Sequence, residues 1–275
     1  MPVTRDRLAV LGSPIHHSRS PAIHRAAYGV LGVDWEYTAI EVTEATLAEF
    51  VGSRDERWRG LSLTMPLKRD ILPLLDRRDP LVDLVGGANT VLFADEGLLG
   101  FNTDVYGVER SFREAGVDAL ASVHVIGAGA TAASVIAGVA RLGATTVTVG
   151  ARTASKAEPL VALGAALGTD VAVVGLADAP AADAVVSTLP GGDYGLSFPA
   201  ALRRRAVLFD VAYDPWPSAL ALQWQDAGGT VIPGIELLLN QAVGQVRVFV
   251  GGDPGLPLSD EESVVAAMRS AVWKD

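Results

Sequence analysis

Lysine is rare in this chain. Of the 22 basic residues only three are lysines, namely Lys68, Lys156 and Lys274. An ammonium group can release a proton at an accessible pH, whereas a guanidinium cannot. Lys68 follows a Thr-Met-Pro-Leu segment, and Asp104 closes an Asn-Thr-Asp cluster further along. A lysine beside a carboxylate could transfer a proton to or from a reacting oxygen. Taken alone, the position of Lys68 favours a surface lysine just before a helix.

A glycine-rich segment indicates a nucleotide site. Residues 127–132 read Gly-Ala-Gly-Ala-Thr-Ala and lie between an apolar strand pattern and an Ala/Val-rich helix pattern. This G-x-G-x-x-A spacing lets the backbone approach a pyrophosphate at a helix N-terminus. About twenty residues on, where an acid would read the ribose hydroxyls of NAD, the chain has Arg152. Arg152, with Thr153 and Lys156, suits the 2′-phosphate of NADP.

Two serines near the start of the chain could bind an anion. Ser20 precedes Pro21, a pair typical of the N-cap and first turn of a helix, and Ser18 lies two residues earlier. Hydroxyls at a helix N-terminus suit a carboxylate. Ser20 could serve as the cap alone, which makes Ser18 the better candidate for binding.

The elements that must position these residues alternate between strand and helix patterns. In the first hundred residues strands are expected at 8–11, 35–42, 61–63, 89–93 and 98–101, and helices at 21–31, 46–51 and 69–75. Further strands are expected near 122–126, 146–149, 171–174, 184–186, 207–211 and 230–232. A βαβ series of this kind forms a doubly wound parallel sheet. Residues 235–250 have one apolar helical face.

The predicted fold class is therefore α/β with two domains. An N-terminal α/β substrate domain is expected at 1–105, together with 235–275, because the C-terminal helix should return to it. A Rossmann-type domain that binds NADP is expected at 106–234.

Four short motifs in the first 104 residues resemble those of shikimate dehydrogenases. They are Gly12 to Pro21 (Gly-Ser-Pro-Ile-His-His-Ser-Arg-Ser-Pro), Gly60 to Lys68 (Gly-Leu-Ser-Leu-Thr-Met-Pro-Leu-Lys), Gly87 to Thr90 (Gly-Ala-Asn-Thr) and Asn102 to Asp104. A fifth, Leu-Asn-Gln-Ala at 239–242, lies in the last expected helix. The resemblance covers nearly the whole chain, and the combination is far more specific than any one motif.

The resemblance implies an NADP-dependent enzyme that interconverts 3-dehydroshikimate and shikimate, a step in aromatic amino-acid biosynthesis. It assigns Lys68 and Asp104 to the reacting oxygen as catalytic residues. The substrate-binding residues it implies are Ser18, Ser20, Thr64, Asn89, Gln241 and Tyr213. The cofactor-binding residues it implies are Gly127, Gly129, Ala130, Ala132, Arg152, Thr153, Lys156, Thr188 and Gly234.

The chain departs from the family pattern at three positions. Ser62 replaces the usual asparagine before the threonine, Ala130 stands where a third glycine is common, and Ser187-Thr188 replaces an asparagine-containing segment. Other readings stay open. The turn residues of a hairpin could instead be Asn89, Thr90, Asn102 and Asp104. Tyr213 could be a core tyrosine. The alternative functions are a quinate/shikimate dehydrogenase, a non-catalytic NADP-binding regulatory relative, and the bifunctional folate dehydrogenase group, which lacks the Ser-x-Ser-Pro segment.

Composition narrows the classes of partner. The chain has 275 residues, no cysteine and a formal net charge of −10. Disulfides and thiolate metal sites are excluded, and the four histidines show no metal-binding spacing. An acidic chain without basic runs is not expected to bind nucleic acid. No apolar run reaches the roughly 18 to 20 residues of a membrane span, and the N-terminus does not resemble a signal peptide. We expect a cytoplasmic monomer or homodimer whose partner is a small molecule.

Overall fold

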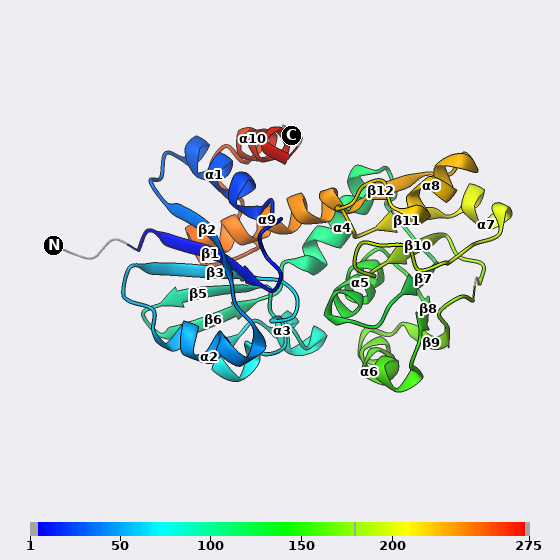
Figure 1. Cartoon of the computed structure of the whole chain (residues 1–275), viewed down its shortest axis with the longest axis horizontal. Coiled ribbons are helices and arrows are strands. Elements are labelled where there is room, and N and C mark those ends of the chain that lie inside the picture. Colours follow the sequence, from blue (N-terminus) through cyan, green and yellow to red (C-terminus); the bar gives the residue numbers. More distant parts are fainter. Residues whose placement is uncertain (1–4, 179, 273–275) are drawn as a thin grey trace. The chain divides into compact units, whose positions relative to one another are not determined.

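The computed structural model describes residues 5–178 and 180–272, and the chain divides into two compact units. Unit 1 comprises Met1–Thr103 and Gln241–Asp275, and unit 2 comprises Asp104–Asn240. Each unit has its own six-stranded sheet (Figure 1). No helix in the described part of the chain is both long enough and apolar enough to cross a membrane.

Unit 1 has a mixed sheet with strand order β2-β1-β3-β5-β6-β4. Strand β1 pairs in parallel with β2 and β3, whereas β3, β5 and β6 pair antiparallel. The strands are β1 (Arg7–Gly12), β2 (Glu36–Glu41), β3 (Trp58–Leu63), β4 (Arg77–Arg78), β5 (Thr90–Ala94) and β6 (Gly97–Phe101). The helices are α1 (Ser20–Leu31), α2 (Glu44–Gly52), the 3-10 helix η1 (Leu72–Leu74), α3 (Pro80–Val85) and α10 (Glu261–Val272). Helix α9 (Gly234–Gly251) begins in unit 2 and continues into unit 1.

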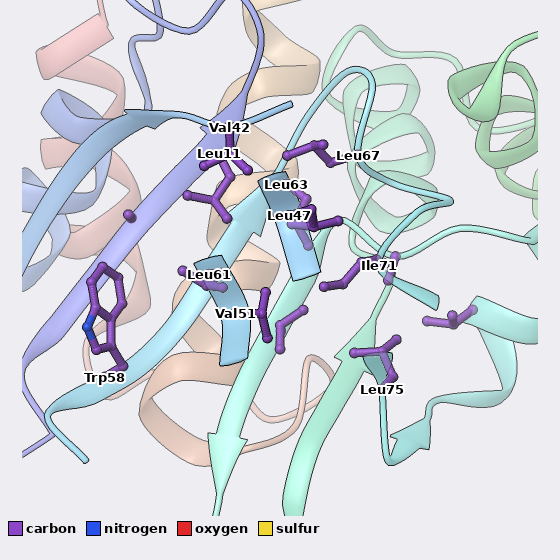
Figure 2. Close-up of a cluster of buried hydrophobic side chains, with 14 residues drawn as sticks. Leu11, Val42, Leu47, Val51, Trp58, Leu61, Leu63, Leu67, Ile71 and Leu75 are labelled. Carbon is purple, nitrogen blue, oxygen red and sulfur yellow. The ribbon is translucent and has the colours of Figure 1, made fainter. Parts of the chain in front are cut away.

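One face of this sheet is covered by α2 and by the loop that follows β3. Figure 2 shows Leu47 and Val51 of α2 over the strands, close to Leu61 of β3. Leu67 and Ile71 of the loop are fully buried in the same cluster. Burying an aliphatic side chain contributes about 1.5 to 3 kcal/mol. These two residues therefore anchor the loop that carries Lys68.

The expected helix at 69–75 is wrong, because this stretch forms turns and only the 3-10 helix η1. Pro73 lies in its middle. Proline lacks the N–H of a helical hydrogen bond and disfavours the α conformation of the residue before it. The apolar pattern correctly indicated that Ile71 and Leu75 are buried, but it did not indicate the conformation of the backbone.

On another side of unit 1, α1 and α10 pack side by side (Figure 1). Helix α1 ends at Gly32, whose φ of 67° is the left-handed C-cap conformation expected of a glycine there. The side chain of Arg19 donates to the backbone oxygen of Val272 over 2.9 Å, which ties the segment before α1 to the end of α10.

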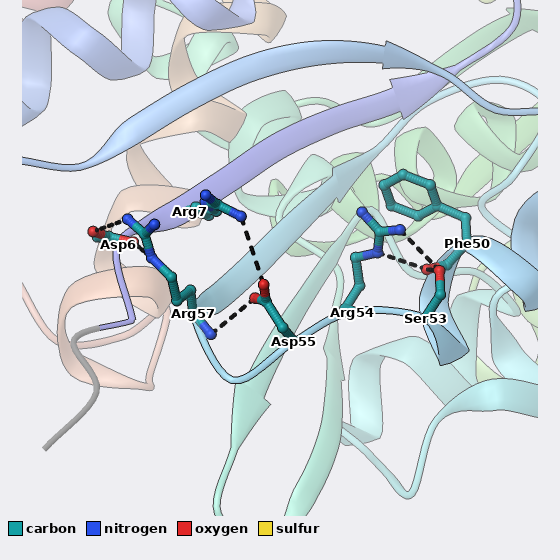
Figure 3. Close-up of polar contacts among 7 residues, drawn as sticks. All are labelled: Asp6, Arg7, Phe50, Ser53, Arg54, Asp55 and Arg57. Atoms are coloured by element: carbon teal, nitrogen blue, oxygen red, sulfur yellow. Dashed lines mark hydrogen bonds and ion pairs between the residues drawn. The ribbon is translucent and has the colours of Figure 1, made fainter.

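The amino ends of β1 and β3 are held by an ionic cluster (Figure 3). The Arg57 guanidinium contacts the Asp6 carboxylate at 2.7 Å and lowers the pKa of that carboxyl, chiefly through their hydrogen bond. Arg54 donates to the backbone oxygen of Phe50 over 2.8 Å and lies over its ring. Exposed ion pairs contribute little stability each. The polar motifs of the sequence lie at the opposite, carboxyl ends of the same strands.

Unit 2 has an entirely parallel sheet with strand order β12-β11-β10-β7-β8-β9. In the order of the unit's own strands this is 6-5-4-1-2-3, the Rossmann arrangement, so the predicted doubly wound fold is confirmed. The strands are β7 (Ser122–Ile126), β8 (Thr146–Ala151), β9 (Asp170–Gly175), β10 (Ala184–Ser187), β11 (Val207–Asp210) and β12 (Val231–Pro233). The helices are α4 (Asp104–Glu114), α5 (Ala130–Arg141), the 3-10 helix η2 (Ala154–Ala157), α6 (Glu158–Leu167), α7 (Ala200–Arg205) and α8 (Ala219–Asp226).

Two histidines are fully buried, one in each unit. Burial lowers the pKa of His24 to about 3 and that of His124 to about 4. His124 donates or accepts only through Nδ1, which lies 2.9 Å from the Thr148 hydroxyl, while its Nε2 has no partner within the described residues. Both rings are therefore neutral in the folded protein at neutral pH.

We expect the free energy of unfolding to be nearly constant between about pH 7 and pH 8 and to fall as the pH drops below 6.5. In that window the unfolded histidines bind protons and the folded ones do not, so acid favours the unfolded state. Each histidine contributes a slope of up to about 1.4 kcal/mol per pH unit. Urea unfolding between pH 4.5 and 8 measures it. The variant His124→Asn should show a shallower slope, whereas His16→Gln, at an exposed position, should not. An unchanged slope in His124→Asn would contradict the expectation.

Candidate active site

The first two polar motifs of unit 1 lie against each other at the carboxyl ends of β1 and β3. The backbone N–H of Ser13 donates to the Met65 oxygen over 3.1 Å, and that of Thr64 donates to the Leu11 oxygen over 2.9 Å. A Cβ at Gly12 would lie 2.5 Å from the Thr64 methyl group and 2.9 Å from the Met65 oxygen. Only glycine permits this approach.

The segment that carries Lys68 is also fixed to the third motif. The Lys68 backbone oxygen accepts from the Ala88 N–H over 2.9 Å, and the Leu63 N–H donates to the Asn89 oxygen over 2.8 Å. The Lys68 side chain is half-buried. The structure thus brings Thr64, Lys68 and Asn89 together at one edge of the sheet.

Asn89 is 1% exposed and its amide is held on both sides. Its Oδ1 accepts from the Thr103 N–H over 2.9 Å, and its Nδ2 donates to the Thr103 hydroxyl over 2.9 Å and to Gln241 Oε1 over 3.2 Å. Asn102 donates to the Gly87 oxygen over 2.8 Å. The turn of the β5–β6 hairpin is at 94–97, so the alternative that these asparagines form a hairpin turn is wrong.

Gln241 reaches this cluster because α9 packs closely on the sheet. A Cβ at Gly60 would lie 2.4 Å from the ring of Phe249, and a Cβ at Gly244 would lie 2.9 Å from Cβ of Thr103. Glycine at both positions lets the helix approach the strand and the Thr103 side chain. Gln241 is 8% exposed in this arrangement.

Ser18 and Ser20 lie before and at the start of α1. Ser20 is the first residue of the helix and Arg19 occupies the N-cap position without a side-chain cap bond, so the expectation that Ser20 is the N-cap is wrong. Instead the Ser18 hydroxyl accepts from the Ser20 N–H over 3.3 Å. This bond supports a local role for Ser18 beside any role in binding.

Asp104 follows Thr103 directly and is the first residue of α4, with 4% exposure. It belongs to unit 2, whereas Lys68 belongs to unit 1. An acid in the first turn of a helix is favoured by the helix dipole. Lys274 lies outside the described residues.

In unit 2 the glycine-rich segment joins β7 to α5. Gly127 has φ of 106° and donates its N–H to the Gly150 oxygen over 2.9 Å, and a Cβ there would lie 2.5 Å from the Thr188 hydroxyl. Gly129 is the N-cap of α5 and has open space on its Cβ side. Ala130 begins the helix and Ala132 is buried in it. At Gly129 the backbone at the N-terminus of α5 is therefore open on its Cβ side, where a phosphate would approach.

The basic residues expected to read the cofactor follow β8. Arg152 and Thr153 are exposed directly after the strand, and Lys156 is exposed in η2. Among the residues that the structure describes, the Arg152 side chain forms no ion pair or hydrogen bond. A cation at this position is available to an anionic ligand.

The remaining candidates lie at the carboxyl ends of β10, β11 and β12, the edge where doubly wound sheets bind ligands. Thr188 follows β10 and its hydroxyl donates to the Ile126 oxygen over 2.9 Å. Tyr213 follows β11 and is half-buried, so it is not a core tyrosine. A Cβ at Gly234 would lie 2.2 Å from the Val211 oxygen, so α9 begins against this backbone.

A pocket lies beside the same strands and is lined in part by Ser187, Asp210 and Ser218. Burial raises the pKa of Asp210, whose carboxylate accepts from the Ser218 hydroxyl. Sequence reasoning missed this buried carboxyl, and it also missed Thr103 as a partner of Asn89. Thr103 could have been found, because it lies inside the Asn-Thr-Asp motif.

Comparisons with known proteins found relatives over nearly the whole chain. Residues 10–91 match the model of the shikimate dehydrogenase substrate binding domain. The chain is 33% identical over 250 residues to the shikimate dehydrogenase (NADP(+)) of Ignicoccus hospitalis, which covers 90% of this chain and 94% of that protein. Among solved structures, shikimate dehydrogenase from Mycobacterium tuberculosis is 38% identical, with a TM-score of 0.81 over 96% of this chain and 99% of that chain. The Thermus thermophilus enzyme, solved in complex with NADP(H) and shikimate, is 30% identical, with a TM-score of 0.82 over 97% and 99%.

Proposed function

Because this chain belongs to the shikimate dehydrogenase family, we infer that it is an NADP-dependent oxidoreductase that reduces 3-dehydroshikimate to shikimate and reverses the reaction. The observation that carries this function beyond family membership is the convergence of Thr64, Lys68, Asn89 and Gln241 in unit 1. The direct test follows NADPH absorbance with 3-dehydroshikimate as substrate, with quinate and NADP supplied in a parallel reaction. Turnover of quinate at a comparable rate would favour the quinate/shikimate alternative.

We propose that unit 1 binds the cyclohexene acid. Thr64, Asn89 and Gln241 supply short polar groups that can hold the ring hydroxyls, and Ser18 and Ser20 supply donors for the carboxylate. Tyr213, a residue of unit 2, is a further candidate for substrate binding. The bonds that hold the Asn89 amide support its role, since a preset orientation lowers the cost of binding.

We propose that unit 2 binds NADP, which supplies the hydride when it is bound. The Gly127–Ala132 turn fits the pyrophosphate, since its glycines have space or a left-handed backbone where a phosphate would approach. Arg152, Thr153 and Lys156 suit the 2′-phosphate, and Thr188 and Gly234 lie at the carboxyl edge of the sheet where the rest of the cofactor would bind. The residues present therefore fit the group.

Lys68 and Asp104 are the proposed catalytic pair. As the carbonyl carbon is reduced, its oxygen gains negative charge, and the Lys68 ammonium stabilises that oxygen and donates a proton to it. In the reverse direction the lysine accepts the proton. Asp104 orients the ammonium and accepts a hydrogen bond from the substrate hydroxyl.

We expect the enzyme to be a monomer or a homodimer, and analytical sedimentation distinguishes the two. We also expect it to work in the cytoplasm, which cell fractionation checks.

Replacing Arg152 with alanine should raise KM for NADP about 10-fold to 100-fold while KM for NAD changes little. The loss of a charge-assisted hydrogen bond costs about 1.5 to 3 kcal/mol, and NAD lacks the phosphate that makes it. Steady-state kinetics with both cofactors measure this. Arg141→Ala is the control, because Arg141 is an exposed arginine of the same unit at the other end of α5. An equal rise for both cofactors would show that Arg152 does not read the 2′-phosphate.

A further inference from the structure

A buried hydrogen-bond network connects α1 to Asn89 in unit 1. It begins at His24, which is 0% exposed. His24 Nδ1 lies 3.2 Å from the Tyr28 hydroxyl, and His24 Nε2 lies 3.1 Å from Gln245 Oε1. The imidazole also stacks on the Tyr37 ring, with 4.0 Å between ring centroids. The ring is thus held by contacts on both nitrogens and on one face.

The backbone oxygen of Asn89 determines the direction of the hydrogen bonds in this network. Gln245 faces the backbone oxygen of Asn89 at 3.0 Å, and a carbonyl can only accept, so the atom of Gln245 on that side is the Nε2 donor. Gln245 Oε1 therefore faces His24 and Ser62, and both of these must donate to it. His24 therefore carries a hydrogen on Nε2, and because burial lowers its pKa to about 3, it is the neutral tautomer with that hydrogen.

Ser62 forms a second branch of the hydrogen-bond network. Its hydroxyl donates to Gln245 Oε1 over 3.0 Å and accepts from the Tyr37 hydroxyl over 2.6 Å. Ser62 is 3% exposed and Tyr37 is 1% exposed. Ser62 is also the position where the chain departs from the usual asparagine of the motif. The small serine leaves room for the tyrosine hydroxyl, and the two together hold the Gln245 amide.

The hydrogen-bond network ends at the candidate substrate-binding residues. Gln245 Nε2 also lies 3.3 Å from the Thr90 hydroxyl, which donates to Asn89 Oδ1 over 2.9 Å. One helical turn before Gln245, Gln241 accepts from Asn89 Nδ2. Two glutamines on one face of α9 thus hold the backbone and the side chain of Asn89 together.

We propose that Gln245, oriented by Ser62 and His24, is a positioning residue that sets Asn89 and Gln241 for the ring hydroxyls of the substrate. The inference rests on the proposed function, because it assumes that Asn89 and Gln241 bind the ring. Gln245 does not touch the substrate itself. It acts by fixing which side of each amide is donor and which is acceptor. A network with this role affects substrate binding specifically, whereas a purely structural network affects stability alone.

The main test replaces Gln245 with methionine, which keeps the length and shape of the side chain but removes both polar groups. KM for shikimate and its dissociation constant by calorimetry should each rise about tenfold, the effect of one or two lost hydrogen bonds at Asn89. KM for NADP should stay within about twofold of wild type, since unit 2 is unchanged. Kinetics are measured well below the unfolding midpoint of each variant.

Thr169→Val is the matched control. Thr169 is 4% exposed and its hydroxyl donates to the Ala144 oxygen. It lies in unit 2 and does not belong to the hydrogen-bond network around Gln245. This variant should lose stability without a change in KM for shikimate. If Gln245→Met fails to fold, Ser62→Ala replaces it, since that change removes one donor to the same amide and should act in the same direction.

A double-mutant cycle with Asn89→Ala tests whether Gln245 acts through Asn89. Once the Asn89 side chain is absent, Gln245→Met should raise KM for shikimate no further. Additive effects, or an unchanged KM in folded Gln245→Met and Ser62→Ala, would overturn the inference. Wild-type protein that fails to oxidise shikimate at all would instead overturn the proposed function, so the two failures are distinct.

Discussion

Replacing Lys68 with alanine should lower kcat for shikimate oxidation by about 10² to 10⁴ and leave substrate binding much less affected. General acid–base catalysis typically contributes a factor of this size. A loss confined to kcat indicates an interaction made in the transition state. The measurement is steady-state kinetics with shikimate and NADP, with calorimetry for shikimate binding.

Two further variants separate the roles of Lys68. Lys68→Arg keeps the positive charge but cannot release a proton readily, so it should also be slow if proton transfer matters. Arg69→Ala is the control, because Arg69 is the exposed neighbour in the same loop, and it should keep wild-type kcat. A folded Lys68→Ala enzyme with near-wild-type kcat, when chemistry limits turnover, would refute the assignment.

Gly12→Ala should lower kcat/KM by about 10²-fold. The added Cβ would lie 2.5 Å from the Thr64 methyl group and 2.9 Å from the Met65 oxygen, so the loop leading to Lys68 must move. A displacement of about 1 Å at a catalytic group can cost a factor of this size. The same crowding should cost about 1 to 3 kcal/mol of stability.

Gly29→Ala is the matched control for this change. Gly29 lies in α1 of the same unit, with nothing within 4 Å of an added Cβ. Alanine there should stabilise the helix by about 0.5 to 1 kcal/mol and leave the kinetics unchanged. Thermal unfolding and kinetics on both variants check the pair, and a folded Gly12→Ala enzyme with wild-type kcat/KM would show that the loop tolerates the shift.

Much of the fold could be predicted because its signals are local. The strand, glycine turn and helix around Gly127 show the Rossmann unit within a short stretch of sequence, and the apolar pattern predicted β1 to within a residue. Strand β3 begins at Trp58, three residues before its predicted start at Leu61. The helix expected at 69–75 failed because Pro73 overrides periodicity. The N-cap assignment of Ser20 failed by one residue, which is within the usual uncertainty of helix ends.

The candidate site could be predicted residue by residue but not as a network. Thr64, Lys68 and Asn89 were found because each lies in a short motif. Gln245 and His24 were missed, because their bonds join residues far apart in the sequence. The only local signal was the spacing of Gln245 four residues after Gln241, which places both on one helical face. The role of the serine at position 62 depends on the Tyr37 hydroxyl, which donates to it from a strand 25 residues away in the sequence.

The discontinuity of unit 1 bears on how the chain is made. Residues up to Thr103 leave the ribosome first, but Gln241 and Gln245, which hold Asn89, follow only after all of unit 2. Domains tend to fold as units during synthesis. Unit 2 can therefore fold before α9 is complete. Until then, the face of the first sheet that includes Gly60 is not covered by this helix. The nascent chain would acquire its dinucleotide fold before the substrate residues are set, and a ribosome that stalled before position 245 would release a chain without an ordered Asn89.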